Sequence, residues 1–167
     1  MNPLLALAAA AGILAVPWVY LFVLIFKLPV WVSFIAGGSF FSAGGQVEGL
    51  KKAGATDILG ILYGAITAAV WLTVGGANAA TSAMIWFLSL IVGIVVFLAV
   101  VESKIELLSF VPGIFFGFGS FFGVFLGKAD PANIIPATRD TLLSIVIGII
   151  FAYIIQYVAG LITKKDS

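Results

Sequence analysis

The residues Gly38-Ser39-Phe40-Phe41 recur as Gly119-Ser120-Phe121-Phe122, 81 positions further along a chain of 167 residues. Each copy lies within a long apolar segment, and three such segments fit into each half of the chain. An odd number of membrane crossings per half makes the second half enter the bilayer from the opposite side. The repeat therefore predicts two inverted halves, a plan in which membrane transporters place a solute site between the halves.

The composition is that of a membrane protein. Apolar residues make up 63% of the chain, charged residues only 9%, and the mean hydropathy is +1.27, whereas a soluble domain has about 25% charged residues. The chain therefore needs the lipid bilayer as a partner. Its eight basic and seven acidic residues nearly balance, which argues against nucleic acid as a partner.

The chain contains no cysteine and no histidine. Their absence removes disulfides, thiol chemistry and nearly every zinc or copper site. No pair of a nucleophile and a base is present either, so we expect no catalytic site, no metal and no cofactor.

Apolar runs of about 20 residues predict membrane-spanning helices. We expect an all-α, polytopic protein with a single membrane domain, in which residues 1–78 form a first three-helix repeat and residues 79–167 a second. The six expected spans are Leu4–Phe26, Pro29–Leu50, Ile58–Gly76, Thr81–Val101, Leu107–Gly127 and Thr141–Thr163.

The basic residues between the spans indicate the orientation. With both termini in the cytoplasm, the cytoplasmic side carries five lysines, Lys51, Lys52, Lys104, Lys164 and Lys165, against Lys27, Lys128 and Arg139 outside. This excess favours cytoplasmic N- and C-termini.

The register of the repeat is open at this point. Asp57 and Asp140 begin the third and sixth expected spans and are 83 positions apart, close to the offset of the tetrapeptide. The segments Ser33–Gly37 and Ser109–Gly113 also resemble each other, but at an offset of 76. A chance repeat in a chain this rich in glycine and phenylalanine is the alternative to an inverted duplication.

The second and fifth expected spans hold most of the glycine. Gly-x-x-x-Gly pairs such as Gly119 and Gly123 let helix backbones approach closely. The alternative is that glycine and serine line a narrow pathway walled by phenylalanine. Four residues are candidates for helix breaks that free backbone carbonyls for a solute: Gly44, Gly45, Pro112 and Gly113.

The repeated tetrapeptides supply six candidate pore-lining residues: Ser39, Phe40, Phe41, Ser120, Phe121 and Phe122. In a true repeat the two serines face each other near the symmetry axis, with the aromatic rings beside them. The alternative for each serine is a hydrogen bond to the carbonyl one turn back.

No charged residue falls at the middle of an expected span. Asp57 and Asp140 are expected to cap helix starts, with a gating role as the alternative. Glu48 forms either an interfacial ion pair with Lys51 or Lys52 or, with Gln46, the mouth of a pore.

The segment Leu107-Leu108-Ser109-Phe110-Val111-Pro112-Gly113 is followed by a helix rich in phenylalanine and glycine, a polar loop and a glycine-containing last span. With Gly12–Leu14 in the first span and Gly148–Tyr153 in the last, it resembles a family of small bacterial inner-membrane proteins catalogued as domain of unknown function 1097. The resemblance implies a six-helix protein of the bacterial inner (plasma) membrane. It implies no activity and no functional residues.

Together these features favour a channel or facilitator for a small neutral or weakly basic solute, with urea-like amides and ammonia as first candidates and a homo-oligomer as the expected assembly. The absence of a charge inside the spans argues against ion coupling. The alternative is a non-conducting membrane scaffold or a regulatory subunit of a neighbouring enzyme or transporter. A coupled transporter that uses Glu48 or Glu102 at its mouths is a third possibility.

Overall fold

The computed structural model describes residues 2–128 and 131–164, and the helical fold expected from the sequence is confirmed there. The described chain forms six α-helices: α1 (Pro3–Tyr20), α2 (Val30–Ser42), α3 (Gln46–Gly75), α4 (Ser82–Glu102), α5 (Val111–Phe125) and α6 (Ile134–Lys164). A π-helical segment, Leu21–Phe26, continues α1, and short 3-10 turns are found at Gly76–Asn78, Glu106–Leu108, Leu126–Lys128 and Pro131–Asn133.

The helices fall into two length classes. Pro3–Phe26, α3, α4 and Ile134–Thr163 are each long and apolar enough to cross a bilayer. By contrast, α2 has 13 residues and α5 has 15. At 1.5 Å per residue they reach about 20 Å and about 22 Å, less than the roughly 30 Å of a hydrocarbon core.

Three expected boundaries are wrong. The expected break at Lys51–Asp57 is helical, because α3 already begins at Gln46. Likewise α6 begins at Ile134, before the expected start at Thr141. The expected second span ends early, at Ser42. Charged residues do not mark helix ends here, because a helix longer than the bilayer is thick carries charge in its outer turns.

The turn between α2 and α3 explains the early end of the second span. Gly44 and Gly45 have φ values of +101° and +65°, a conformation that glycine adopts without steric cost. The first turn of α1 is fixed differently: Asn2 caps it, because its side chain accepts a hydrogen bond from the Leu4 amide at 2.9 Å.

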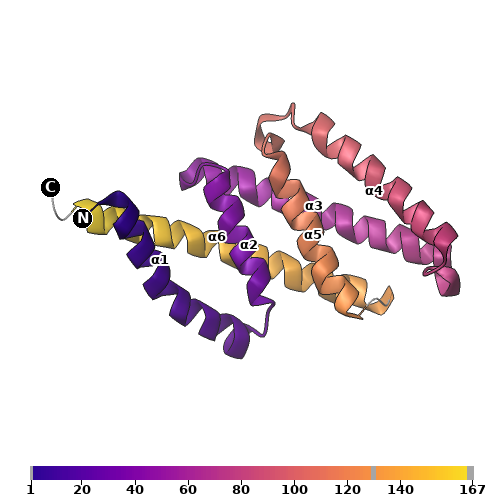
Figure 1. The fold of residues 1–167 in the computed structure, drawn as a ribbon, viewed down its shortest axis with the longest axis horizontal. Helices are drawn as coiled ribbons and strands as arrows, with labels where there is room; N and C mark the ends of the chain where they lie inside the picture. Colours follow the sequence, from indigo (N-terminus) through magenta and orange to yellow (C-terminus); the bar gives the residue numbers. More distant parts are fainter. Residues whose placement is uncertain (1, 129–130, 165–167) are drawn as a thin grey trace.

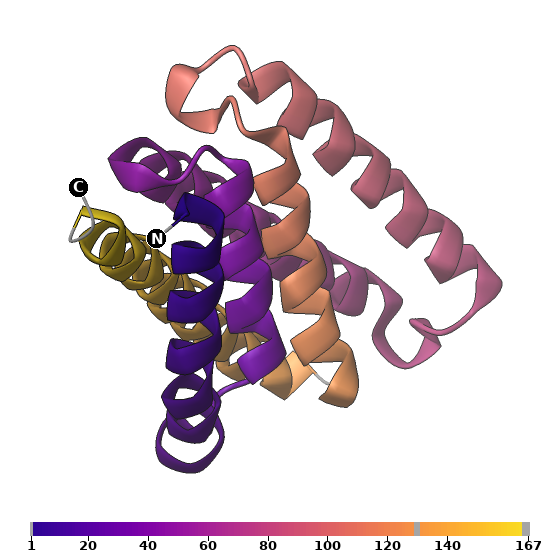
Figure 2. The ribbon, with the colours of Figure 1, turned by 60° about the vertical axis from the view of Figure 1, so that its left-hand side comes forward.

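The helices form two layers (Figures 1 and 2). In the front layer α2 and α5 lie side by side at the centre, with α1 beyond α2 and α4 beyond α5. The long helices α3 and α6 run obliquely behind them, α6 packing against α1 and α2, and α3 against α4 and α5. Each short helix therefore packs mainly on the long helix of the other half of the chain.

Two glycines bring the layers together. At Gly60 on α3, an added Cβ would overlap the carbonyl oxygen of Ile114 on α5. At Gly148 on α6, it would lie 2.7 Å from the carbonyl oxygen of Ser33 on α2. The backbones touch at both crossings, so only glycine fits there without displacing a helix.

Candidate functional site

The interior of the molecule contains one buried carboxylate, Asp57, among the described residues. It lies about three turns inside α3 and has 0% exposure. Its Oδ1 accepts a hydrogen bond from the Ser39 hydroxyl of α2 at 2.7 Å. The expectations that Asp57 caps a helix start, and that the spans hold no charge, are both wrong.

The backbone of α5 closes over Asp57 on another side. A Cβ at Gly113 would lie 2.8 Å from Asp57 Oδ1 and would overlap the Thr56 hydroxyl. At Gly117 it would overlap the backbone carbonyl of Asp57. The Gly113 and Gly117 pair is therefore a packing surface that lets α5 lie directly against this part of α3.

Three buried polar atoms near the centre of the fold have no hydrogen-bond partner in the described structure: Asp57 Oδ2, Thr67 Oγ1 and Ser120 Oγ. Buried polar groups are usually satisfied, and an unmet one costs about 1–3 kcal/mol. Unpaired groups of this kind commonly mark a place where water or a ligand binds. Their presence in the interior of a membrane protein is therefore the first pointer to a site.

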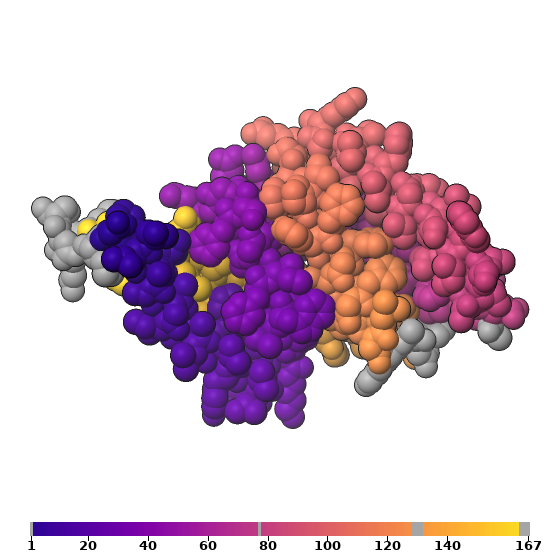
Figure 3. Space-filling model, in the orientation of Figure 1, coloured from indigo at the N-terminus to yellow at the C-terminus, as the bar shows by residue number. Residues whose placement is uncertain are grey.

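An open groove of about 360 Å³ runs between α2 and α5, which share one face of the molecule (Figure 3). Four residues of each helix line it: Trp31, Ile35, Gly38 and Ser42 of α2, and Phe115, Phe116, Gly119 and Ser120 of α5. The unpaired Ser120 is thus part of the groove, whereas Ser39 is hydrogen-bonded to Asp57 behind it.

The candidate pore-lining phenylalanines are divided between core and surface. Phe40 and Phe121 are fully buried, while Phe41 is 38% exposed and Phe122 is partly buried. The ring of Phe40 contacts Phe41 and Tyr153, and that of Phe121 stacks on Phe125 at 5.5 Å. Across the described chain, no ring contact joins the Phe40/Phe41 pair to the Phe121/Phe122 pair.

The candidate helix-break residues lie at helix ends. Gly44 and Gly45 form the turn before α3, and Pro112 and Gly113 belong to the first turn of α5. A proline there removes no helical hydrogen bond, because the first amide groups of a helix have no partner within it.

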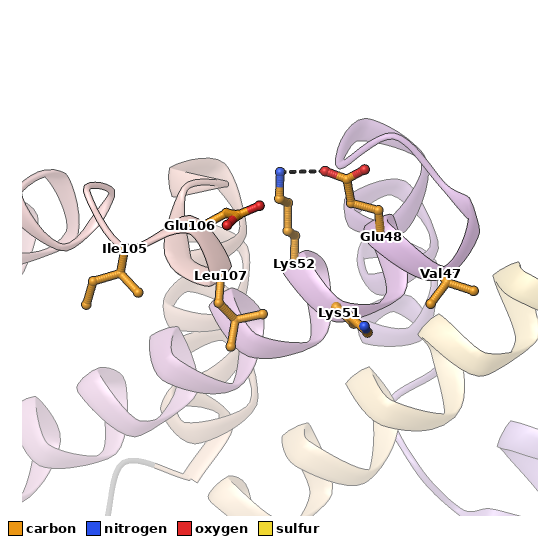
Figure 4. Close-up of a pocket in the computed structure, with 7 residues that line it drawn as sticks. All are labelled: Val47, Glu48, Lys51, Lys52, Ile105, Glu106 and Leu107. Atoms are coloured by element: carbon orange, nitrogen blue, oxygen red, sulfur yellow. Dashed lines mark ion pairs between the residues drawn. The ribbon is translucent and has the colours of Figure 1, made fainter.

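The candidate mouth residues lie near the start of α3. Glu48 pairs with Lys52 at 2.7 Å, one of the two ion pairs expected for it, and its role at a pore mouth stays a prediction. An open pocket of about 740 Å³ adjoins the pair, and in it Glu106 also points toward Lys52 (Figure 4). The backbone amide of Gln46 donates to the side-chain Oε1 of Gln156 at 2.6 Å, which ties the turn to α6.

Comparison with known proteins identifies the family of this chain. Residues 8–160 match the family described as "Protein of unknown function (DUF1097)". The chain belongs to this family. It is 32% identical to the inner membrane protein YcdZ of Escherichia coli K12 and 30% identical to YcdZ of Salmonella typhimurium LT2. Both alignments cover 92% of this chain, with 83% and 85% of the respective relatives. No solved structure matches.

The family resemblance drawn from the sequence is confirmed, and this DUF1097 protein is a membrane protein whose relatives lie in the inner membrane. Two of its polar contacts were missed by sequence reasoning. The indole nitrogen of Trp18 donates to the Ser33 hydroxyl at 2.9 Å, and the Tyr63 hydroxyl donates to Glu102 Oε1 at 2.6 Å. Each bond joins two different helices, so no pattern of neighbouring residues in the sequence predicts it.

Asp140 also differs from its expected role as a cap. It lies inside α6, two turns after Ile134, and pairs with the neighbouring Arg139 at 2.8 Å. Its side chain is partly exposed, unlike that of Asp57. The two acids therefore occupy different environments, and their similar spacing in the sequence does not make them equivalent.

Proposed function

We propose that this protein is a channel or facilitator for a small neutral or weakly basic solute, and that it carries the solute without changing it chemically. Urea-like amides and ammonia are the first candidates. The observation that carries the proposal is the groove between two short helices, α2 and α5, whose lining includes Ser120, a buried serine with no hydrogen-bond partner for its hydroxyl among the described residues.

The positions of the short helices support an inverted repeat. Each is the second helix of its half, and each is shorter than the hydrocarbon core is thick. Unusually short apolar segments at corresponding positions of two halves point to the solute site in transporters built from inverted repeats.

The glycine crossings support the same relationship, with one offset for the short helices and another for the long ones. Ser33 and Ile114, whose carbonyls face the two glycines, are 81 positions apart, as are the repeated tetrapeptides. Gly60 and Gly148 are 88 positions apart. Thr56 and Ser144 share this second offset, and each donates to a carbonyl one turn back at 2.7 Å.

With these offsets, two of the four groove-lining residues on each helix correspond to each other. Gly38 corresponds to Gly119 and Ile35 to Phe116, so corresponding residues of the two halves face it from opposite walls. We infer that the pseudo-twofold axis passes through the groove, and that a second copy of the chain closes its open side in a homo-oligomer. We also propose that both termini are cytoplasmic. Residues 1 and 165–167 lie outside the described residues.

A non-conducting scaffold is the second candidate, and one observation favours it. The contacts of Gly60, Gly113 and Gly117 leave no space between α3 and α5 at these three positions, which favours a packed interface there. The facilitator and the scaffold therefore make different predictions for the groove between α2 and α5: a solute passes through it only in the facilitator.

The experiment is stopped-flow light scattering on proteoliposomes with a panel of urea, formamide, acetamide and ammonia. We expect the wild-type chain to carry at least one solute several-fold faster than empty liposomes. Gly38→Phe is expected to reduce this flux, because a Cβ at Gly38 meets nothing within 4 Å and the ring has the groove to fill. Gly12→Phe, also at an open position but on α1, is the matched control.

Flux equal to that of empty liposomes for every solute would establish the scaffold instead. Equal loss of flux in Gly38→Phe and Gly12→Phe would remove the groove from the pathway.

A further inference from the structure

Asp57 has no positive partner. The described residues place no basic side chain in an ion pair with it. Helices α2 and α5, which pack against this region, contain no charged residue. On α3 itself Lys52 is paired with Glu48, and on α6 Arg139 is paired with Asp140.

An uncompensated carboxylate inside a membrane protein is costly, and such residues are usually functional. Ser39 satisfies only Oδ1, and Oδ2 has no donor. Protonation would remove the charge, but a proton on Oδ2 would have no acceptor among the described residues. A small cation with N–H donors meets both needs, since it brings positive charge and a hydrogen bond to Oδ2.

The two halves differ at this point. With offsets of 81 and 88, Ser39 corresponds to Ser120 and Asp57 corresponds to Ile145, and both Asp57 and Ile145 are fully buried. Ser120 therefore lacks the acid that Ser39 has, which agrees with its unpaired hydroxyl. Among the described residues, the proposed repeat therefore has a fully buried acid in its first half only.

We propose that Asp57 binds the solute and selects a small cation of the ammonium type, one per chain. The proposal rests on the function proposed above and names its solute class. Size follows from burial: Asp57 has 0% exposure and the backbone of α5 lies against Oδ1, so the cation has to reach Oδ2 and be as small as ammonium or methylammonium. Ser39 positions the carboxylate by holding Oδ1.

Two measurements test the proposal. The first is uptake of radiolabelled methylammonium into proteoliposomes by the wild-type chain and by Asp57→Asn. Asparagine keeps an oxygen that accepts from Ser39 but replaces the second oxygen with a donor. We expect methylammonium uptake to fall at least about tenfold, the effect of losing a charged hydrogen bond.

The second measurement is thermal unfolding of the purified chain in mild detergent, with ammonium chloride compared with sodium chloride at the same ionic strength. Binding to the folded state raises the unfolding temperature. We expect ammonium to stabilise the wild-type chain and not Asp57→Asn. The comparison of ammonium chloride with sodium chloride on the wild-type chain still tests the site if Asp57→Asn does not fold.

The outcomes separate this proposal from the one on which it rests. Wild-type passage of urea with exclusion of methylammonium, or equal methylammonium uptake by Asp57→Asn, overturns the cation site and leaves a facilitator. No flux of any solute overturns the facilitator, and ammonium stabilisation that requires Asp57 then still supports the cation site. Absence of that stabilisation in the wild-type chain counts against the site in either case.

Discussion

The Ser39 hydroxyl of α2 donates a hydrogen bond to Oδ1 of Asp57 on α3, 2.7 Å away, and both side chains are fully buried. The corresponding hydroxyl of Ser120 on α5 is also buried but has no partner among the described residues. One serine thus holds a buried acid, and its counterpart in the other half does not.

This difference predicts unequal effects of the same substitution at two corresponding positions. Ser39→Ala leaves both oxygens of Asp57 without a donor, so we expect a loss of about 1–3 kcal/mol in the free energy of unfolding. Ser120→Ala removes a hydroxyl that has no bond and is expected to be neutral or slightly stabilising. Denaturant-induced unfolding in mild detergent compares the two.

Equal effects of these two substitutions would contradict the assignment of Asp57 to Ser39 alone. Asp57→Asn is the internal check, because an asparagine oxygen still accepts from Ser39. In the Asp57→Asn background we therefore expect Ser39→Ala to remain destabilising, by a smaller amount.

The two crossings should be equally intolerant of a methyl group. Gly60→Ala and Gly148→Ala each force a Cβ against the backbone of a short helix, and overpacking of this kind costs about 1–3 kcal/mol. Gly93→Ala on α4 is the control, because a Cβ there meets nothing within 4 Å. Alanine also favours a helix over glycine, so the control should be at least as stable as the wild type. A tolerated Gly60→Ala or Gly148→Ala would show that the layers are further apart than described.

The bond between Tyr63 and Glu102 predicts another loss. Tyr63→Phe leaves the Oε1 atom of Glu102 without its donor at 2.6 Å, and Oε2 is already unpartnered. We expect a loss of about 1–3 kcal/mol, with Tyr157→Phe, at a position 61% exposed, as a silent control. Thermal unfolding of the two variants checks this. Equal stability of both variants and the wild type would place Glu102 in contact with water instead.

The sequence predicts the fold class well because helices in a membrane need long apolar runs, and α1, α4 and α6 have them. The sequence-based prediction of helix boundaries fails where a helix is long enough to contain charged residues in its outer turns. Lys51 and Lys52 were placed in a break between helices, yet the 30-residue α3 is long enough to carry its charged first turns beyond the hydrocarbon.

The candidate site was found only in part. The repeated tetrapeptide identifies Ser39 and Ser120 on the two central helices, because a short identical stretch is visible in one sequence. The hydrogen bond between Ser39 and Asp57 could not be predicted, because Thr56-Asp57 has the residue types of a helix start. Only the crossing of α2 over α3 brings Ser39 and Asp57 together, and that contact depends on tertiary packing.

In the proposed inverted repeat, the two halves cross the membrane in opposite senses, and α2 and α5 each cross it. Lys27 and Lys104 test it, because each lies exposed in the link between the first and second helix of its half. In the six-crossing arrangement the two lysines lie on opposite sides. If only the four long helices cross, both lie on the same side.

The chain has no cysteine, so Lys27→Cys and Lys104→Cys each introduce a single thiol. The measurement is labelling of each variant by a membrane-impermeant maleimide in intact spheroplasts, compared with labelling after lysis. We expect Lys27→Cys to react in intact spheroplasts and Lys104→Cys to react only after lysis. Labelling of both thiols from the same side would contradict the inverted repeat.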